Sequence, residues 1–416
     1  MEEVTIAKLV HGGQGLGELS DGRKVFVWNT LPGEKVHARI IKKKRSYAEA
    51  IAEEILEASP ERVEPVEANY LATSPWQMMT FDAENKYKKA IVAELFQQAH
   101  VQIPEFQVTA PVEQWQYRNK MEYSFWGDDE GLHLALHQRG SHGKQIVAGS
   151  KLAMPAIDVA ANAILAQLQK LETRAGDLKT IIVRTSQQGD AAVALFVKPE
   201  TLAKLDLPPE IKGLRVYHSN PKSPASVPTK LLYELGDTTL TDELLGKPFA
   251  YDVDSFFQVN IPIFEKALQR IKEFCNEPDI VDMYAGVGSI GLSVAKSRVE
   301  LIELDPATAN MARANAAESS LQAEVVEAST EKALEYIVAD KPVIFDPPRA
   351  GLHTKVANRV LETLPPKIIY LSCNPATQAR DLALLQEKYA VAYFEAFNFF
   401  PRTPHIETLV VLELLQ

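Results

Sequence analysis

The second half of the chain alternates short apolar runs with stretches whose apolar residues have helical spacing. From about residue 249 the apolar runs include "DIVDMYAG", "VELIELD", "KPVIFDPP" and "KIIYLSCN". This alternation predicts βαβ units and a mainly parallel sheet covered by helices on both faces, so we assign residues 249–416 to an α/β domain. The last two runs, "VAYFEAFNFF" and "ETLVVLELL", have no helix between them and predict an antiparallel hairpin at the end of the sheet.

The first half of the chain follows two other patterns. In residues 1–58, short strand-like runs are broken by glycine and proline turn signals, which predicts a small five-strand barrel. "ASPERVEP" is typical of a linker. Residues 59–248 mix strand runs such as "KTIIVRTS" with the helical run "MPAIDVAANAILAQLQKLE", so we expect an α+β middle domain there. Its first helix, near 78–100, is able to pack on the last domain.

The composition is that of an ordinary globular protein. Of the 416 residues, 46% are hydrophobic and 24% are charged. No apolar run approaches the length of a membrane span, and the start "MEEVTIAKLV" lacks the features of a signal peptide. We therefore expect a cytoplasmic protein without a membrane partner. The net charge of −11 is only weak evidence against a nucleic-acid partner, because it averages over the whole chain whereas binding depends on local patches. One such patch is "RIIKKKR" at 39–45, for which a solvated face is the simpler interpretation.

"DMYAGVGSIG" follows the first strand of the predicted sheet and opens a helix. Gly286, Gly288 and Gly291 have the spacing G-x-G-x-x-G, which in this context predicts a nucleotide-binding turn. NAD and the methyl donor S-adenosylmethionine are both candidates, as is a turn without any ligand. Asp282, four residues before the first glycine, and Glu303, at the end of the next strand and placed for ribose hydroxyls, favour the methyl donor.

Three chemically suggestive residues fall at strand ends, where the ligands of open α/β sheets bind. Asp346 ends the fourth strand in "PVIFDPPRAG", whose two prolines fix the loop. Cys373 ends the fifth strand beside a helix start, an environment that stabilises a thiolate nucleophile, although a buried structural cysteine is the commoner case. Glu407 begins the antiparallel last strand at the same edge and can face Cys373. Cys275 lies away from that edge and is assigned a structural role, and two distant cysteines predict neither a disulfide nor a metal site.

The segment "YRNKMEYSFW" interleaves basic and aromatic residues. Its basic residues are Arg118 and Lys120, and its aromatic residues are Tyr117, Tyr123, Phe125 and Trp126. A surface of this kind stacks bases and holds phosphates. A half-buried strand whose basic side chains reach to solvent explains the pattern equally well.

Several of these motifs resemble those of one enzyme family. "GGQGLGELSDGRKVFVWNTLPGEKVHARIIKKKRSYAEA" resembles a TRAM domain, the small OB-like RNA-binding barrel of RNA-modifying enzymes, and this moves the basic patch toward RNA. "FFQVN", "DMYAGVG", "DPPRAG", "SCNP" and "HIET" resemble, in this order, the RNA uridine-C5 methyltransferases, over nearly the whole chain. The resemblance implies a Rossmann-like class I methyltransferase domain with S-adenosylmethionine as cofactor. It implies that the catalytic residues are Cys373, as nucleophile, and Glu407, as general base, and that the donor-binding residues are Gln258, Tyr284, Glu303 and Asp346.

The implied chemistry explains why these residue types are needed. Carbon 5 of uracil is a poor nucleophile, so a thiolate adds to carbon 6 and the resulting enolate attacks the methyl group of the donor. A base then removes the proton from carbon 5, and the thiol leaves. The uridine must be unpaired or flipped out of its stack.

The chain departs from the family pattern in two places. Many members hold an iron–sulfur cluster with four cysteines, whereas "VEPVEANYLATSPWQMM" and "AGSKLAM" contain none, so we expect no such cluster and no metal. The acidic residue that often lies near the adenine is not identifiable, with Glu327 and Glu331 as candidates. We expect a monomer whose partner is RNA, and the TRAM barrel favours ribosomal RNA over tRNA.

Other functions stay open. An amine-directed nucleobase methyltransferase uses a similar DPP loop, but it follows the prolines with an aromatic residue where this chain has Arg349, and it leaves Cys373 and Glu407 without roles. A catalytically silent RNA-binding protein with a relic sheet is another candidate. A dehydrogenase is disfavoured, because we find no hydride-handling site.

Overall fold

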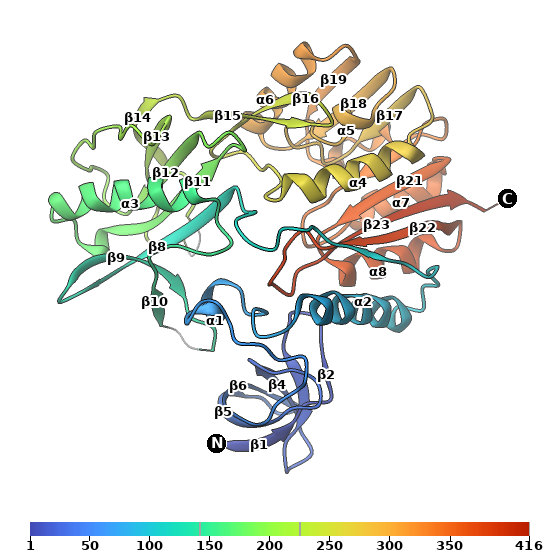
Figure 1. Cartoon of the computed structure of the whole chain (residues 1–416). Helices are drawn as coiled ribbons and strands as arrows, with labels where there is room; N and C mark the ends of the chain where they lie inside the picture. Colours follow the sequence, from blue (N-terminus) through green and yellow to red (C-terminus); the bar gives the residue numbers. More distant parts are fainter. Residues whose placement is uncertain (141–142, 224–225, 416) are drawn as a thin grey trace.

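The computed structural model describes residues 1–140, 143–223 and 226–415. Figure 1 shows three bodies: an N-terminal sheet in blue, a middle sheet in cyan to green, and a C-terminal sheet with its helices in yellow to red. No helix in the described part of the chain is long and apolar enough to cross a membrane.

The N-terminal sheet has six strands within residues 1–57, all described, rather than the five expected. The strands are β1 (Glu2–Thr5), β2 (Lys8–Leu9), β3 (Gly15–Glu18), β4 (Lys24–Trp28), β5 (Lys35–Lys43) and β6 (Tyr47–Glu57), in the order β1-β5-β6-β4-β3-β2. The extra strand arises because the first apolar run changes partner. Ile6 N donates to Glu34 O (2.9 Å), whereas Ala7 N donates to Leu16 O (2.8 Å). One segment therefore supplies both edges of the sheet, which curls back on itself.

The basic patch "RIIKKKR" lies on β5 and the turn after it. Arg39 pairs with Glu53 of β6, and Lys42 pairs with Glu49 of the same strand (3.3 Å). Residues 43–45 are exposed. Part of the patch is thus neutralised by cross-strand carboxylates, and its free charge is concentrated in the last three residues.

The middle sheet runs in the order β10-β9-β8-β11-β12-β13-β14. Its strands are β8 (Lys120–Asp128), β9 (Gly131–His137), β10 (Lys144–Ile146), β11 (Leu178–Thr185), β12 (Ala191–Val197), β13 (Gly213–His218) and β14 (Lys230–Gly236). Helix α3 (Pro155–Lys170) buries its apolar side against this sheet. A hairpin of β15 (Thr239–Leu244) and β16 (Lys247–Asp252) leads to the C-terminal body, so β16 spans the expected division at residue 248.

The aromatic residues of "YRNKMEYSFW" belong mostly to the core. Tyr117, Tyr123 and Phe125 are buried, and the last two pack in the same cluster as α3. The interpretation of this segment as a base-stacking surface is therefore wrong for these three side chains. Tyr123 and Phe125 are alternate residues of β8 that face the helix, and Tyr117, before the strand, is buried and donates to Pro401 O (3.0 Å). Trp126 is 44% exposed.

The C-terminal sheet runs in the order β19-β18-β17-β20-β21-β23-β22-β7. Its strands are β7 (Val108–Thr109), β17 (Asp279–Asp282), β18 (Arg298–Glu303), β19 (Gln322–Glu327), β20 (Val343–Phe345), β21 (Lys367–Ser372), β22 (Tyr389–Phe397) and β23 (Glu407–Leu414). Neighbours from β19 to β21 are parallel, which confirms the predicted mainly parallel sheet. The expected antiparallel hairpin is β22 and β23, and β7 adds a short strand beyond it.

Helices cover both faces of this sheet, as expected (Figure 1). On one face lie α4 (Ile261–Phe274), α5 (Gly291–Val294) and α6 (Pro306–Glu318), which share one apolar cluster. On the other lie α7 (Thr354–Thr363), α8 (Pro375–Leu385) and α2 (Phe81–Gln98), which share a second cluster. Helix α2 precedes the middle sheet in sequence, yet its Phe96 packs edge-on against Phe394 of β22, with ring centroids 4.9 Å apart. The remaining short elements are α1 (Tyr70–Thr73) and the 3-10 turns η1 (Ala175–Asp177), η2 (Thr330–Lys332) and η3 (Leu334–Tyr336).

A buried ion pair joins α2 to the loop between β22 and β23. Lys88 Nζ lies 2.8 Å from Glu84 Oε1, and both side chains are at most 1% exposed. Lys88 also donates to Asn398 Oδ1 (2.6 Å). Glu84 Oε2 accepts the backbone N–H of Arg402 (2.9 Å). The pair thereby fixes the loop that leads to Glu407.

A polar joint ties the linker to the segment after β10. Glu67 accepts hydrogen bonds from Thr73 Oγ1 (3.0 Å), Gln77 Nε2 (2.6 Å) and the backbone N–H of Lys151 (2.9 Å). Gln77 Nε2 also donates to Ser74 Oγ (2.6 Å). This joint connects the two cysteine-free stretches "VEPVEANYLATSPWQMM" and "AGSKLAM".

Candidate active site

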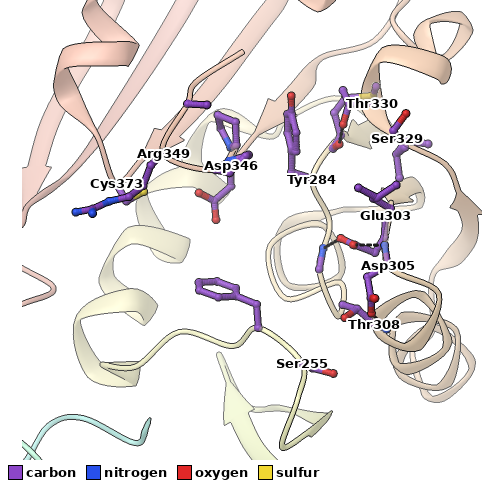
Figure 2. A pocket seen from close by; sticks show the side chains of 18 of the residues that line it. Ser255, Tyr284, Glu303, Asp305, Thr308, Ser329, Thr330, Asp346, Arg349 and Cys373 are labelled. Carbon is purple, nitrogen blue, oxygen red and sulfur yellow. Dashed lines mark hydrogen bonds between the residues drawn. The ribbon is translucent and has the colours of Figure 1, made fainter. Parts of the chain in front are cut away.

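The six residues predicted from the sequence all line one cavity of about 1710 Å³. The cavity lies at the carboxyl ends of the parallel strands, where ligands of such sheets are expected. It also extends to the middle sheet. Figure 2 shows Cys373, Asp346, Tyr284 and Glu303 following one another around its wall. Gln258, before α4, and Glu407, at the start of β23, complete the predicted set.

The glycine turn after β17 is open toward this cavity. Gly286 and Gly288 have φ of +56° and +86°, values that L side chains rarely adopt. A Cβ at Gly286 would meet no atom within 4 Å, whereas one at Gly288 would lie 2.7 Å from Leu292 Cδ1. Gly286 therefore leaves room for a ligand, and Gly288 allows the turn to pack on α5.

Glu303 shapes the same turn from the end of β18. Its Oε2 accepts the N–H of Gly286 (2.9 Å), and its Oε1 accepts the N–H of Asp305 (2.8 Å). Figure 2 shows these bonds as dashed lines. Each carboxylate oxygen can accept more than one hydrogen bond, so Glu303 is also able to accept ribose hydroxyls.

Asp282 stands behind the turn and is absent from the lining of the cavity. The side chain is fully buried, and its Oδ2 accepts the N–H of Gly291 (2.9 Å). Burial raises the pKa of this carboxyl to about 7. The acidic residue of the sequence motif therefore holds the start of α5, and we assign it no contact with a ligand.

Cys373 and Glu407 are cross-strand neighbours at the edge of the sheet. The register pairs Ser372 of β21 with Thr408 of β23, so the next residue on each strand, Cys373 and Glu407, lies at the same level. Cys373 is partly exposed to the cavity, whereas Cys275 is buried (1% exposed). The structure thus brings together the two residues that the sequence placed at one edge.

The electrostatics of this pair differ from the expectation. Cys373 directly precedes Asn374, the N-cap of α8, and a helix N-terminus is one of the environments that stabilise a thiolate. Burial, followed by the charges of Glu407 and Asp346, nevertheless raises the pKa of the Cys373 thiol to about 12, although the charge of Arg349 and a backbone hydrogen bond act in the opposite direction. Burial and the two nearby carboxyls therefore outweigh the stabilisation of a thiolate that the helix terminus offers in the protein by itself. The thiol needs a proton acceptor.

The two carboxyls near the thiol are unusually basic. Burial and then the charge of Asp346 raise the pKa of Glu407 well above its ordinary value, and Arg349 lowers it. Burial and then the charge of Asp282 raise the pKa of Asp346 to about 7. Glu407 Oε2 is buried without a hydrogen-bond partner among the described residues. A carboxyl of this kind is a strong proton acceptor once ionised, as a general base must be.

Sequence reasoning missed part of the wall. Phe256 (62% exposed) and Leu304 (66% exposed) present large apolar side chains to the cavity. Of the two candidates for the adenine neighbour, Glu331 lines the cavity, whereas Glu327 pairs with Arg313. The sequence offered one signal for this apolar wall, namely that Phe256 lies two residues before the predicted donor-binding residue Gln258 in "FFQVN".

The donor set fits S-adenosylmethionine. The Gly286 turn leaves room beside Glu303, apolar surfaces suit an adenine, and acidic groups at the Cys373 end suit the positive sulfonium. Among the described residues, no group of three or more His, Cys, Asp or Glu side chains could hold a metal ion.

Comparisons with known proteins agree with this geometry. Residues 230–415 match the family model described as tRNA (Uracil-5-)-methyltransferase, and residues 1–52 match the TRAM domain. An uncharacterized RNA methyltransferase of Enterococcus faecalis is 30% identical over 99% of this chain and 96% of its own, and one of Listeria monocytogenes is 32% identical over 99% and 97%. The crystal structure of Pyrococcus abyssi tRNA (uracil-54, C5)-methyltransferase in complex with S-adenosyl-L-homocysteine superposes with a TM-score of 0.78, covering 98% of this chain and 100% of that one at 21% identity, which shows the same fold.

Proposed function

We propose that this protein methylates carbon 5 of uridine in ribosomal RNA through a covalent adduct of Cys373. The premise is that the chain belongs to the tRNA (uracil-5-)-methyltransferase family and is an S-adenosylmethionine-dependent RNA methyltransferase. One observation carries the proposal: Cys373 and Glu407 sit at the same level of adjacent strands and line the same cavity as the glycine turn. An amine-directed enzyme has no use for this pair.

Each proposed step follows from a group on the wall. Cys373 Sγ bonds to carbon 6 of the uracil, while the thiol proton passes to a carboxylate of the cavity. S-adenosylmethionine, when bound, would supply an electrophilic methyl group to carbon 5, with S-adenosylhomocysteine as the leaving group. Glu407 then removes the proton from carbon 5, the bond between Sγ and carbon 6 breaks, and the double bond between carbons 5 and 6 is restored. Arg349 lowers the pKa of both Cys373 and Glu407, so it stabilises the negative charge that each must acquire.

We assign donor binding to Gln258, Tyr284, Glu303 and Asp346. Glu303 is supported by its position under the open turn, and Asp346 by its place between Tyr284 and Cys373 in Figure 2. We also propose Glu331 as the acidic neighbour of the adenine, because it lines the cavity.

The proposed domains are the TRAM barrel 1–58, the middle domain 59–248 and the methyltransferase domain 249–416. The TRAM match supports an RNA target, and we propose ribosomal RNA, methylated by a cytoplasmic monomer. Incubating the enzyme and labelled donor separately with total tRNA and with ribosomal RNA from a strain lacking the enzyme tests this choice. Label in tRNA without label in ribosomal RNA would reject it.

Two variants test the mechanism. Cys373→Ala should abolish methylation and leave donor binding intact, and Cys275→Ala, the matched control at a buried cysteine outside the cavity, should remain active. Glu407→Gln should methylate carbon 5 but fail to release the RNA, so a retarded enzyme–RNA band should accumulate on a denaturing gel. Methylation by Cys373→Ala at more than a trace rate, or normal turnover by Glu407→Gln, would contradict the assigned roles.

A further inference from the structure

Three parts of the chain meet at the loop that leads to Glu407. In the N-terminal barrel, a Cβ at Gly13 would lie 2.5 Å from Pro404 Cβ, so the barrel loop lies directly against this segment. Trp76 Nε1 donates to Gly13 O (3.1 Å) and holds the loop there. In the middle body, a Cβ at Gly140 would lie 2.9 Å from Ile41 Cδ1 of the barrel. The turn after β9 therefore reaches the N-terminal sheet. Tyr117 Oη, just before β8, donates to Pro401 O (3.0 Å), so the middle body also contacts this loop, and the three bodies adjoin at one junction beside the active site.

Basic side chains from two of these bodies converge on this junction. Arg349 Nη2 lies 2.9 Å from His405 Nδ1, and Figure 2 shows Arg349 next to Cys373. The Arg118 guanidinium lies 5.9 Å from the ring centroid of Phe400, whose ring centroid is in turn 5.9 Å from that of His405. Arginines from the segment before β8 and from the DPP loop therefore lie near the same histidine.

Arg139 brings a third arginine from the turn after β9. Its guanidinium stacks 4.7 Å from the ring centroid of Trp28 in the barrel. We call Arg118, Arg139 and Arg349 the junction arginines.

The junction arginines lack direct ion-pair partners within the described ranges. None of the junction arginines forms an ion pair with any carboxylate of the described residues. The Nε atoms of Arg118 and Arg139 are buried and lack a hydrogen-bond partner in the described part of the chain. Burial, followed by the charges of Arg349 and Arg118, with smaller effects of Lys88 and Arg139, lowers the pKa of His405 to about 3. Buried donors and uncompensated cations are costly unless a ligand satisfies them.

We propose that the junction arginines bind the phosphodiester groups that flank the target uridine. The proposal rests on the proposed function, because the arginines have this role only if an RNA strand delivers a base to Cys373. A guanidinium presents a planar fork of donors that matches two phosphate oxygens. Arg349 borders both the junction and the cavity, so a strand held at the junction can turn one base past Arg349 toward the thiol.

The first test measures the salt dependence of RNA binding with Arg139→Gln. The probe is a short single-stranded oligoadenylate with one central uridine, and affinity is measured by fluorescence anisotropy over a range of salt. Loss of one phosphate contact should lower the slope of log affinity against log salt by about 0.7 and weaken binding about fivefold at 0.1 M salt. Arg139→Lys should keep the slope because it keeps the charge. Arg174→Gln, the control at an exposed arginine without an ion pair among the described residues, should keep both slope and affinity.

The second test identifies the contacted group. A neutral methylphosphonate replaces the linkage on the 5′ side of the uridine in one probe and on the 3′ side in another. If Arg139 contacts one of these phosphates, that substitution weakens binding to the wild-type protein but has little further effect on Arg139→Gln. Equal losses in both proteins for both probes, or an unchanged salt slope in Arg139→Gln, would overturn the proposal. Failure of the proposed function is distinguishable, because the wild-type enzyme would then form no 5-methyluridine in any RNA.

Discussion

The buried pair of Glu84 and Lys88 gives the sharpest test of how the active-site loop is held. Lys88→Met keeps most of the side-chain volume but removes the ammonium, which leaves the Glu84 carboxylate fully buried without its opposite charge. The carboxylate keeps two donors, the N–H of Arg402 and Asn398 Nδ2, at 2.9 Å each. Glu84→Gln leaves Lys88 in the converse position, with Asn398 Oδ1 and Phe400 O as acceptors.

The expected cost follows from the loss of charge compensation. Removing one partner of a buried ion pair costs about 3 to 5 kcal/mol, and we expect the lower half of that range because hydrogen bonds to the loop remain. Replacing both partners removes both buried charges. The double variant Glu84→Gln/Lys88→Met should therefore cost at least about 2 kcal/mol less than the sum of the single variants.

Hydrogen exchange of the loop itself is the appropriate assay, because the Arg402 amide donates directly to Glu84. Mass spectrometry of peptides covering residues 398–405 gives the free energy of opening locally, without assuming that the whole chain unfolds in one step. Turnover should fall in the single variants, because this loop leads into Glu407. Costs below about 1 kcal/mol, or costs that add in the double variant, would refute the view that the pair holds the loop.

Three further outcomes are expected. Because the pKa of Asp282 is raised, the stability that this carboxyl contributes is present below the ordinary carboxyl pKa and is lost as pH rises through about 7. The free energy of unfolding should therefore fall by up to about 4 kcal/mol between pH 4 and pH 8. Asp282→Asn should remove this fall, as measured by melting temperature against pH. Gly286→Ala should cost about 1 kcal/mol of stability, because the residue has a positive φ. It should weaken donor binding about tenfold or more in calorimetry, because the new Cβ points into open space at the donor site. Unchanged donor affinity would contradict this placement. Replacing Lys43, Lys44 and Arg45 with alanine should lower the salt slope of RNA binding without moving the methylated uridine, whereas an unchanged slope would identify the patch as a solvated face.

Much of the C-terminal body could be predicted because its signals are local. Alternating apolar runs predicted the sheet, and the missing helix before the last strand predicted that Glu407 and Cys373 meet at one edge. Strand direction is a topological property, so it needs no knowledge of side-chain packing. The glycine spacing likewise predicted a turn whose positive φ angles the structure shows at Gly286 and Gly288.

What could not be predicted depends on contacts between distant segments. The pKa of the Cys373 thiol is raised by burial and then by carboxyls 34 residues after it and 27 before it, at positions 407 and 346. Tyr123 is buried because α3 packs on its face of the sheet, and the alternation of residues along β8 does not show which face the helix covers. The convergence of Arg118, Arg139 and Arg349 likewise arises only when the three bodies come together.

The polar joint around Glu67 also determines what this protein needs in order to assemble. A joint made of carboxylate, amide and hydroxyl groups forms as the chain folds, and it requires no iron, sulfide or assembly machinery. Its hydrogen bonds transfer no electrons, so oxidants that dismantle a thiolate-held cluster have no reactive atom to attack there. The side chains of Glu67, Thr73, Ser74 and Gln77 therefore supply the groups that hold this joint together.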